Sequence, residues 1–345
     1  MFSTTTGVAV ASKTAPRQCP GCSGESIGPY YLAGTVDGGV HWTVTGRLPS
    51  DVADPFFASV RLAFANPDEG YLDYRPSGTG PPVILYTTTG GRTWSTLHPP
   101  ATRAGIESLI GTSLWVGADI CPSGVTTGPA CKSGLLTYTL GHPDPDSEMT
   151  IPVEGVPRAD VGTPEQPDII GRIDATTAVV REGGEGGPTS LQLTDDSGQH
   201  WQPLPDPCGS VVPEGVVVTT PGTWTMYCSI DGGLNQGHVE VYTTTDQGRH
   251  WAFTAQANPG DPTAGTIPDT LGYDLTASGN GQDLWLVGNV VGLIASADAG
   301  AHWTNVFIQT DGAQPILATA GATEAWLPTP TGLYHTTDGT TWSTL

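Results

Sequence analysis

The side chains of this 345-residue chain that could do acid–base or metal chemistry are its 34 acidic residues, eight histidines and six cysteines. Four histidines share one setting, each standing directly before a tryptophan: His41, His200, His250 and His302. The other four fall in different stretches of the chain: His98, His142, His238 and His335. Because neither set has the spacing of metal ligands, we predict no metal site and no cofactor.

Two long predicted loops, residues 142–168 and 255–271, concentrate acidic side chains and are the candidate binding surface. Their candidate residues are Asp144, Asp146, Glu154, Asp160, Asp168, Asp261 and Asp269. Long loops on a rigid scaffold often carry function. A glycosidase needs two carboxyl groups roughly 5 to 10 Å apart, and so acidic a chain does not exclude such a pair. A solvated insertion is the alternative interpretation of the first loop.

The histidine–tryptophan pairs belong to an eight-residue frame, Thr/Ser-x-Asp-x-Gly-x-x-Trp, that returns along nearly the whole chain. Its third and last positions are Asp37 and Trp42, Thr89 and Trp94, Asp196 and Trp201, Asp246 and Trp251, Asp298 and Trp303, and Asp338 and Trp342. The last copy is one residue short between Asp and Trp. A short Asp or Thr side chain bonds backbone N–H groups of its own turn, Gly permits a positive φ, and Trp anchors the turn on a core. The frame therefore predicts a turn between two strands.

The tryptophans of the frame are nearly evenly spaced, except that the gap from Trp94 to Trp201 is about twice the others. We place a degenerate unit there, with residues 136–141 as the strand before a lost frame. The chain then holds seven units of about 49 residues, a period typical of propellers. The predicted fold is all-β: a seven-bladed β-propeller of four-stranded antiparallel blades, with the frame between the third and fourth strands and residues 1–345 as a single domain.

The second unit serves as the template, with strands predicted at residues 59–64, 70–74, 83–88 and 93–97. Short β-rich runs mark the second strand of other units, several of them containing a tryptophan: Trp115, Trp224, Trp285 and Trp326. In the first unit, Phe2 aligns with Phe64, so that the unit lacks most of its first strand. Either the natural N-terminus, with its signal or anchor, has been trimmed, which we favour, or the gap is covered in another way.

The frame resembles the Asp-box, or BNR, repeat of sialidase-like propellers, and the wider unit resembles the bacterial seven-bladed proteins grouped with the photosystem II assembly factor Ycf48. The resemblance covers essentially the whole chain. In those families the boxes lie on the face opposite the ligand site, which implies a structural role for the Asp and Trp positions of the frame. Any working surface is then expected on the opposite face.

Two function classes remain, because fold does not imply function. The favoured one is a non-catalytic binding or scaffold module for a protein, peptide or glycan. The alternative is a glycoside hydrolase of a sialidase-like or related group. A sialidase would need three converging arginines and a Tyr–Glu pair, and only Arg61, Arg172 and Arg181 stand on suitable strands. An assembly factor of the Ycf48 kind is expected to use a basic patch, for which this chain has too few arginines.

The six cysteines form three local pairs: Cys19 and Cys22, Cys121 and Cys131, and Cys208 and Cys228. Even, local pairing in a loop-rich chain favours disulfides and an oxidising compartment. For Cys19 and Cys22 a redox motif or half of a zinc site is the rival interpretation. A redox motif needs a helix N-terminus, and zinc needs four ligands.

Composition limits the partners further. Lys and Arg total 12 against 34 acidic residues, a formal net charge of −22, which disfavours nucleic acid and anionic membranes. No apolar run is long enough to be a signal peptide or a membrane span. We expect an acidic, monomeric, extracytoplasmic protein, secreted or on the surface of a bacterium.

Overall fold

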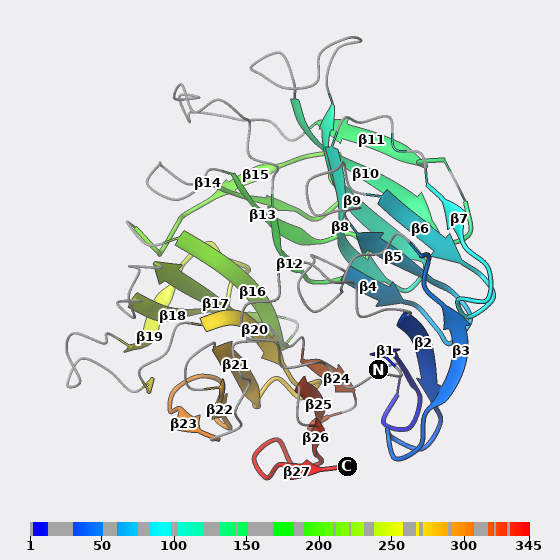
Figure 1. The fold of residues 1–345 in the computed structure, drawn as a ribbon. Coiled ribbons are helices and arrows are strands. Elements are labelled where there is room, and N and C mark those ends of the chain that lie inside the picture. The colour runs from blue at the N-terminus through cyan, green and yellow to red at the C-terminus, as the bar shows by residue number, and fades with distance from the viewer. Residues whose placement is uncertain are drawn as a thin grey trace, which may run out of the picture. The chain divides into compact units, whose positions relative to one another are not determined.

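The computed structural model describes most of the chain (Figure 1). The described residues are 3–12, 30–50, 61–74, 83–97, 99, 103–120, 132–142, 144–150, 168–182, 190–209, 212–220, 222–230, 238–257, 267–268, 272–288, 292–306, 317–320, 322–329 and 332–345. The chain divides into two compact units: Met1–Val153 with Pro157–Asp168, and Glu154–Val156 with Ile169–Leu345.

The first unit contains three antiparallel sheets. The first has three strands: β1 (Gly7–Ser12), β2 (Tyr30–Thr35) and β3 (Thr43–Arg47). The second has four: β4 (Arg61–Phe64), β5 (Gly70–Tyr74), β6 (Val83–Thr87) and β7 (Ser95–Thr96). The third also has four: β8 (Arg103–Ile110), β9 (Ser113–Ile120), β10 (Lys132–Thr139) and β11 (Ser147–Thr150).

The second unit contains four antiparallel sheets of four strands each. The fourth sheet of the chain is β12 (Asp168–Arg172), β13 (Ala178–Glu182), β14 (Ser190–Thr194) and β15 (Gln202–Leu204). The fifth is β16 (Val212–Thr220), β17 (Thr223–Ile230), β18 (His238–Thr244) and β19 (Ala252–Ala257). The sixth is β20 (Gly272–Ala277), β21 (Leu284–Gly288), β22 (Gly292–Ser296) and β23 (Thr304–Asn305). The seventh is β24 (Ala318–Ala320), β25 (Glu324–Thr329), β26 (Gly332–Thr336) and β27 (Ser343–Thr344).

The predicted fold class is confirmed: the chain is an all-β, seven-bladed propeller, and no helix occurs among the described residues. Strands follow one another in sequence order within every sheet, so each blade is a simple antiparallel meander. In the second sheet the observed strands lie within the four predicted segments.

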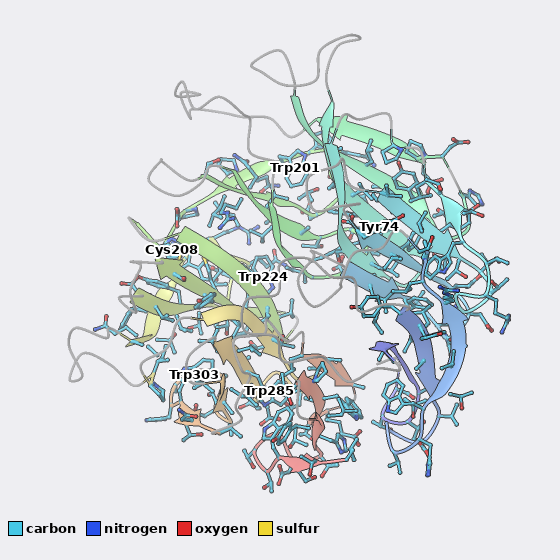
Figure 2. All side chains as sticks on the ribbon, in the orientation of Figure 1. Tyr74, Trp201, Cys208, Trp224, Trp285 and Trp303 are labelled. Carbon is cyan, nitrogen blue, oxygen red and sulfur yellow. A yellow bond between two sulfur atoms is a disulfide. The ribbon has the colours of Figure 1, made fainter. Side chains whose placement is uncertain are left out.

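The core is built chiefly from the second strand of each four-stranded sheet. Trp115, Trp224, Trp285 and Trp326 stand on β9, β17, β21 and β25 and are at most 2% exposed. Trp224 and Trp285 are labelled in Figure 2. Apolar clusters pack between consecutive sheets of one unit, as where Val179 and Leu193 of the fourth sheet meet Trp224 and Met226 of the fifth. Large, flat side chains fill the space between sheets packed face to face, which fixes each sheet against its neighbour in the same unit.

Candidate functional site

Every copy of the frame forms the turn between the last two strands of its sheet. Each begins at the last residue of one strand, and its tryptophan directly precedes the next strand, as Thr244 ends β18 and Trp251 precedes β19. The turn also rests on the connection between the two earlier strands where both are described. Gly90 N–H donates to Asp68 O, and Ala299 N–H donates to Gln282 O. The frames therefore stand at one defined end of their sheets.

The first frame residue organises the turn through its buried hydroxyl group. Thr244 Oγ1 accepts the N–H of Gly248 at 3.0 Å and donates to Asp246 Oδ1 at 2.8 Å. Ser296 does the same with Gly300 at 2.9 Å and Asp298 at 2.9 Å. Because the glycine N–H is buried, it needs this acceptor. The hydroxyl therefore joins the turn's backbone to its carboxylate.

The turn passes through two successive residues with positive φ in the five full-length copies. The second is always glycine, as in Gly248 (φ 81°) and Gly300 (φ 93°). The first is glycine in two copies but Ser197, Gln247 or Ala299 in the others, with φ between 57° and 63°. Residues with a Cβ atom carry a conformational cost in this region. The short sixth copy turns at Gly339 alone (φ 79°).

Four frames contain a pair that the sequence analysis did not foresee, an aspartate bound to the histidine four residues later. The Nδ1–Oδ2 distance is 2.5 to 2.6 Å for His41 with Asp37, His200 with Asp196, His250 with Asp246, and His302 with Asp298. The other carboxylate oxygen accepts the histidine's backbone N–H at 2.8 to 2.9 Å. The histidine side chains are 80 to 88% exposed. The Asp-x-x-x-His spacing was visible in the sequence and is the signal that could have revealed these pairs.

These contacts keep the frame carboxylates ionised. The backbone N–H of His41 and the side chain of His41 lower the pKa of Asp37 to about 2. The backbone N–H and ring of His200 lower the pKa of Asp196 to about 2, and the ring and backbone N–H of His250 lower the pKa of Asp246 to about 2. Burial alone would raise the pKa of Asp298, but the hydrogen bonds from His302 and Ser296 outweigh it and lower that pKa. The N–H groups of Thr341 and Thr340 lower the pKa of Asp338.

Thr89 replaces the aspartate in the second frame and keeps the same connections with a hydroxyl group. Its Oγ1 accepts the N–H of Thr93 at 3.0 Å and lies 2.8 Å from Thr93 Oγ1.

The frame tryptophans are less buried than the predicted anchoring role suggests. Trp303 is 6% exposed, while Trp42, Trp94, Trp201, Trp251 and Trp342 are only partly buried.

The turn in the third sheet corrects one prediction. Residues 142–168 were expected to form one long loop on the face away from the frames, but β11 (Ser147–Thr150) lies inside this segment and pairs with β10. Asp144 and Asp146 therefore stand in the β10–β11 turn, where the other sheets carry their frames. Both are exposed, and Asp146 Oδ1 lies 4.0 Å from His142 Nδ1. The segment was predicted as a loop because its turn lacks the frame, although the fourth strand of the sheet is present.

The remaining loop candidates are not brought together by the described residues. Asp168 begins β12. Glu154, Asp160, Asp261 and Asp269 lie outside the described residues. Within the part of the chain that is described, no three histidines, cysteines or acidic residues group so as to hold a metal ion. The same part contains no helix that is long and apolar enough to cross a membrane.

One predicted disulfide is confirmed. Cys208 and Cys228 are bonded, and both are buried in the cluster between the fourth and fifth sheets (Cys208 is labelled in Figure 2). Cys208 stands on the connection before β16 rather than on that strand, while Cys228 lies on β17. The other predicted pairs, Cys19 with Cys22 and Cys121 with Cys131, lie outside the described residues. A disulfide is compatible with an extracytoplasmic location.

A sialidase requires a tyrosine nucleophile with a glutamate partner, and the structure contains a tyrosine that is hydrogen-bonded to a glutamate. Tyr242 Oη donates to Glu240 Oε2 at 2.6 Å, both on β18. Burial, and then the glutamate, raise the pKa of Tyr242. A nucleophilic tyrosine needs the opposite shift. Arg172, on β12, donates to the backbone oxygens of Asp174 and Ala175 at 3.2 Å each.

Comparisons with known proteins found solved structures with a similar fold but no match to a family model or a curated sequence. No family model matches the sequence. No curated protein matches it either. Among solved structures, the chain is similar to YCF48 bound to D1 peptide, with 18% identity over 86% of this chain and 83% of that one and a TM-score of 0.51. A structure from an analysis of two prolyl endopeptidases has 13% identity over 92% of this chain and 46% of that one, with a TM-score of 0.56.

A sialidase of Trypanosoma rangeli in complex with the inhibitor DANA is a weaker match. Its identity is 12% over 83% of this chain and 53% of that one, with a TM-score of 0.46. The similarity to YCF48 agrees with the predicted resemblance to propellers of the Ycf48 kind, for the fold alone. At such identities the likeness does not extend to activity or ligand.

Proposed function

We propose that this chain is a non-catalytic, extracytoplasmic propeller that binds a protein, peptide or glycan at the sheet ends opposite the frames. In this proposal the frames hold the strands in place. The loops at the other ends, including the predicted loop with Asp261 and Asp269, recognise the ligand. We further propose that residues 1–345 act as one monomeric domain.

The proposal rests on one observation: the frame carboxylates already accept hydrogen bonds within their own turns. Asp246 accepts bonds from Thr244 Oγ1, from His250 N–H and from the His250 ring, all inside its own turn. A carboxyl group with a pKa of about 2 has no proton to give at neutral pH, so it is unsuited to act as a general acid. The most conspicuous repeated acids of the chain therefore have a structural explanation.

A peptide is the ligand class with the most support. The fold is similar to that of YCF48, which has been solved with a D1 peptide bound. Binding to a preorganised scaffold costs an extended peptide partner little ordering of the protein. The net charge of −22 favours a neutral or basic ligand over nucleic acid.

The proposal is tested by assaying the purified chain in parallel against a panel of chromogenic glycosides with a fluorogenic sialoside, and against peptide and glycan arrays. We expect selective array binding without glycoside turnover. Asp261→Asn and Asp269→Asn should weaken array binding, while Asp246→Asn, on the opposite sheet end, should leave it unchanged. Robust turnover that Asp261→Asn or Asp269→Asn abolishes would establish the glycoside hydrolase alternative instead.

A further inference from the structure

The outer strands of the fifth sheet, β18 and β19, carry a pair of aromatic side chains near their frame. Tyr242 stands opposite Phe253, and the two ring centroids are 5.7 Å apart with the ring planes at 77°. Tyr242 is half-buried against the cluster between the fourth and fifth sheets, whereas Phe253 is 55% exposed. An edge-to-face pair therefore presents a large apolar ring to solvent.

Two carboxyl groups lie close to this aromatic pair. Tyr242 Oη donates to Glu240 Oε2 at 2.6 Å, and the two residues share one face of β18 because they are two apart. Burial, then Glu240 and then Asp206 raise the pKa of Tyr242. Asp206, on the connection that follows β15, therefore lies close enough to act on the same hydroxyl group. The surroundings of the rings thus favour a positive charge.

The disulfide holds the two carboxyl groups on the same side of the sheet. Cys208, labelled in Figure 2, is bonded to Cys228, and Cys228 is directly opposite Glu240. Asp206 Oδ1 accepts the N–H of Cys208 at 2.9 Å. The bond therefore ties the segment that carries Asp206 to the strand beside Glu240. Both acids are partly exposed, so a ligand can reach a site that is already formed.

The sister sheets show that the fold does not require this combination. At the position of Tyr242 and Phe253, the other sheets that carry a frame have no second aromatic pair. Two residues before the position of Tyr242, none of them has an acid. The corresponding pairs are Ala33 with Val44, Leu85 with Thr96, Gln192 with Pro203, Ile294 with Asn305, and Tyr334 with Thr344.

We propose that the surface formed by Phe253, Tyr242, Glu240 and Asp206 binds the guanidinium group of an arginine side chain from a partner protein or peptide. The guanidinium group would pack on the Phe253 ring and donate N–H groups to the two carboxylates. Arginine fits better than lysine because its planar group stacks on aromatic rings, is more weakly hydrated and can reach two carboxylates at once. A wholly apolar partner would strip water from the carboxylates without replacing their hydrogen bonds.

The charge of this half of the chain supports a basic partner. Arg249 is the only lysine or arginine in residues 182–345, a segment with many acidic residues. Arg249 itself donates to the backbone oxygen of Asp246 in its own turn. A cation is therefore attracted to this region. The surface lies beside the frame of the fifth sheet, so the interaction is separate from loop-end recognition and does not depend on it.

N-acetyl-arginine amide is the probe that tests the proposal. It is titrated into the full chain labelled with ¹⁵N at phenylalanine and tyrosine, and the amide signals are followed by NMR. We expect saturable shifts at Phe253 and Tyr242 that weaken as salt is added. N-acetyl-citrulline amide is the matched control, since a neutral urea group of nearly the same shape replaces the guanidinium group. It should cause no saturable shift.

Single substitutions test the two parts of the surface. Phe253→Thr introduces the residue type that two sister sheets have at this position, and it should raise the Kd about two- to fivefold. Glu240→Gln keeps an acceptor for Tyr242 and should also raise the Kd about two- to fivefold. Val44→Thr removes an exposed apolar side chain at the same position of the first sheet and should leave the Kd unchanged.

Four results would overturn the proposal. The arginine probe could cause no saturable shift at Phe253 and Tyr242, or the citrulline probe could cause the same shifts. Phe253→Thr and Glu240→Gln could leave the Kd unchanged. Shifts of equal size at phenylalanines and tyrosines throughout the chain would show only a general attraction to an acidic surface. Tighter binding of N-acetyl-lysine amide would assign the surface to a different cation. None of these results bears on glycoside turnover or loop-end binding.

Discussion

The turn between β18 and β19 and the turn between β10 and β11 join equivalent strands, yet they are held in different ways. In the first, the side chains of Thr244 and Asp246 bind the backbone and the His250 ring. In the second, backbone groups bond one another, as where His142 N–H donates to Thr139 O and Asp146 N–H donates to Thr137 O. A four-stranded sheet therefore does not require the frame. The frame is one way to hold the last turn, in which side chains take the place of backbone partners.

The largest expected effect comes from a glycine present in both turns. Gly248 has φ 81°, and an added Cβ would lie 3.0 Å from Leu204 and 3.3 Å from Trp251. Gly141 has φ 83°, but there an added Cβ would meet only Thr88, at 3.7 Å. We expect Gly248→Ala to lower the free energy of unfolding by about 3 kcal/mol and Gly141→Ala by about 1 to 2 kcal/mol, measured by urea denaturation. Equal losses would mean that packing does not distinguish the two turns.

Removal of the frame hydroxyl should have the next largest effect. Thr244→Val keeps the shape of the side chain but leaves the buried N–H of Gly248 without its acceptor. The expected loss is about 1 to 2 kcal/mol in the same denaturation experiment. Thr245→Val, at the exposed neighbouring position, is the control and should change stability little. If both variants unfold at the same urea concentration, the hydroxyl does not hold the turn.

Acid should weaken the frame turns selectively. The folded pKa of Asp246 is about 2, below its ordinary value of 3.8, so its stabilising contribution is complete above about pH 4 and is lost as the pH falls toward 2. Asp246→Asn should therefore lower the melting temperature at pH 7 and reduce its fall between pH 4 and pH 2. Asp144→Asn in the third sheet's turn is the control. A fall in melting temperature unaffected by Asp246→Asn would assign the acid sensitivity to other groups.

The smallest effect is a gain in stability. Ala299 has φ 57° at a frame position where two other copies have glycine. Ala299→Gly should raise the free energy of unfolding by about 0.5 kcal/mol, because the relief of left-handed strain exceeds the added entropy of the unfolded chain. Ala301→Gly, two residues later, should instead lower it slightly. A loss at both positions would show that the strain at Ala299 is negligible.

The sequence predicted those features that have a repeated chemical cause. The frame marked the last turn of six sheets, and β-rich runs around residues such as Trp224 and Trp285 marked second strands. β11 was missed because Ser147–Thr150 has neither a frame before it nor an apolar alternation of its own. The Asp–His pairs were missed because each histidine was treated only as the residue before a tryptophan. The loop residues Asp261 and Asp269 remain predictions, since nothing local in the sequence fixes how distant loops approach one another.

The disulfide between Cys208 and Cys228 changes the covalent topology of the fifth sheet. The two cysteines are 20 residues apart, and the ring they close contains the whole of β16 and the connection from β16 to β17. A single backbone cut within this ring does not separate the chain into two molecules. The first strand of that sheet is thus retained even after a protease has cut the connection between β16 and β17, and the two fragments separate only when the bond is reduced.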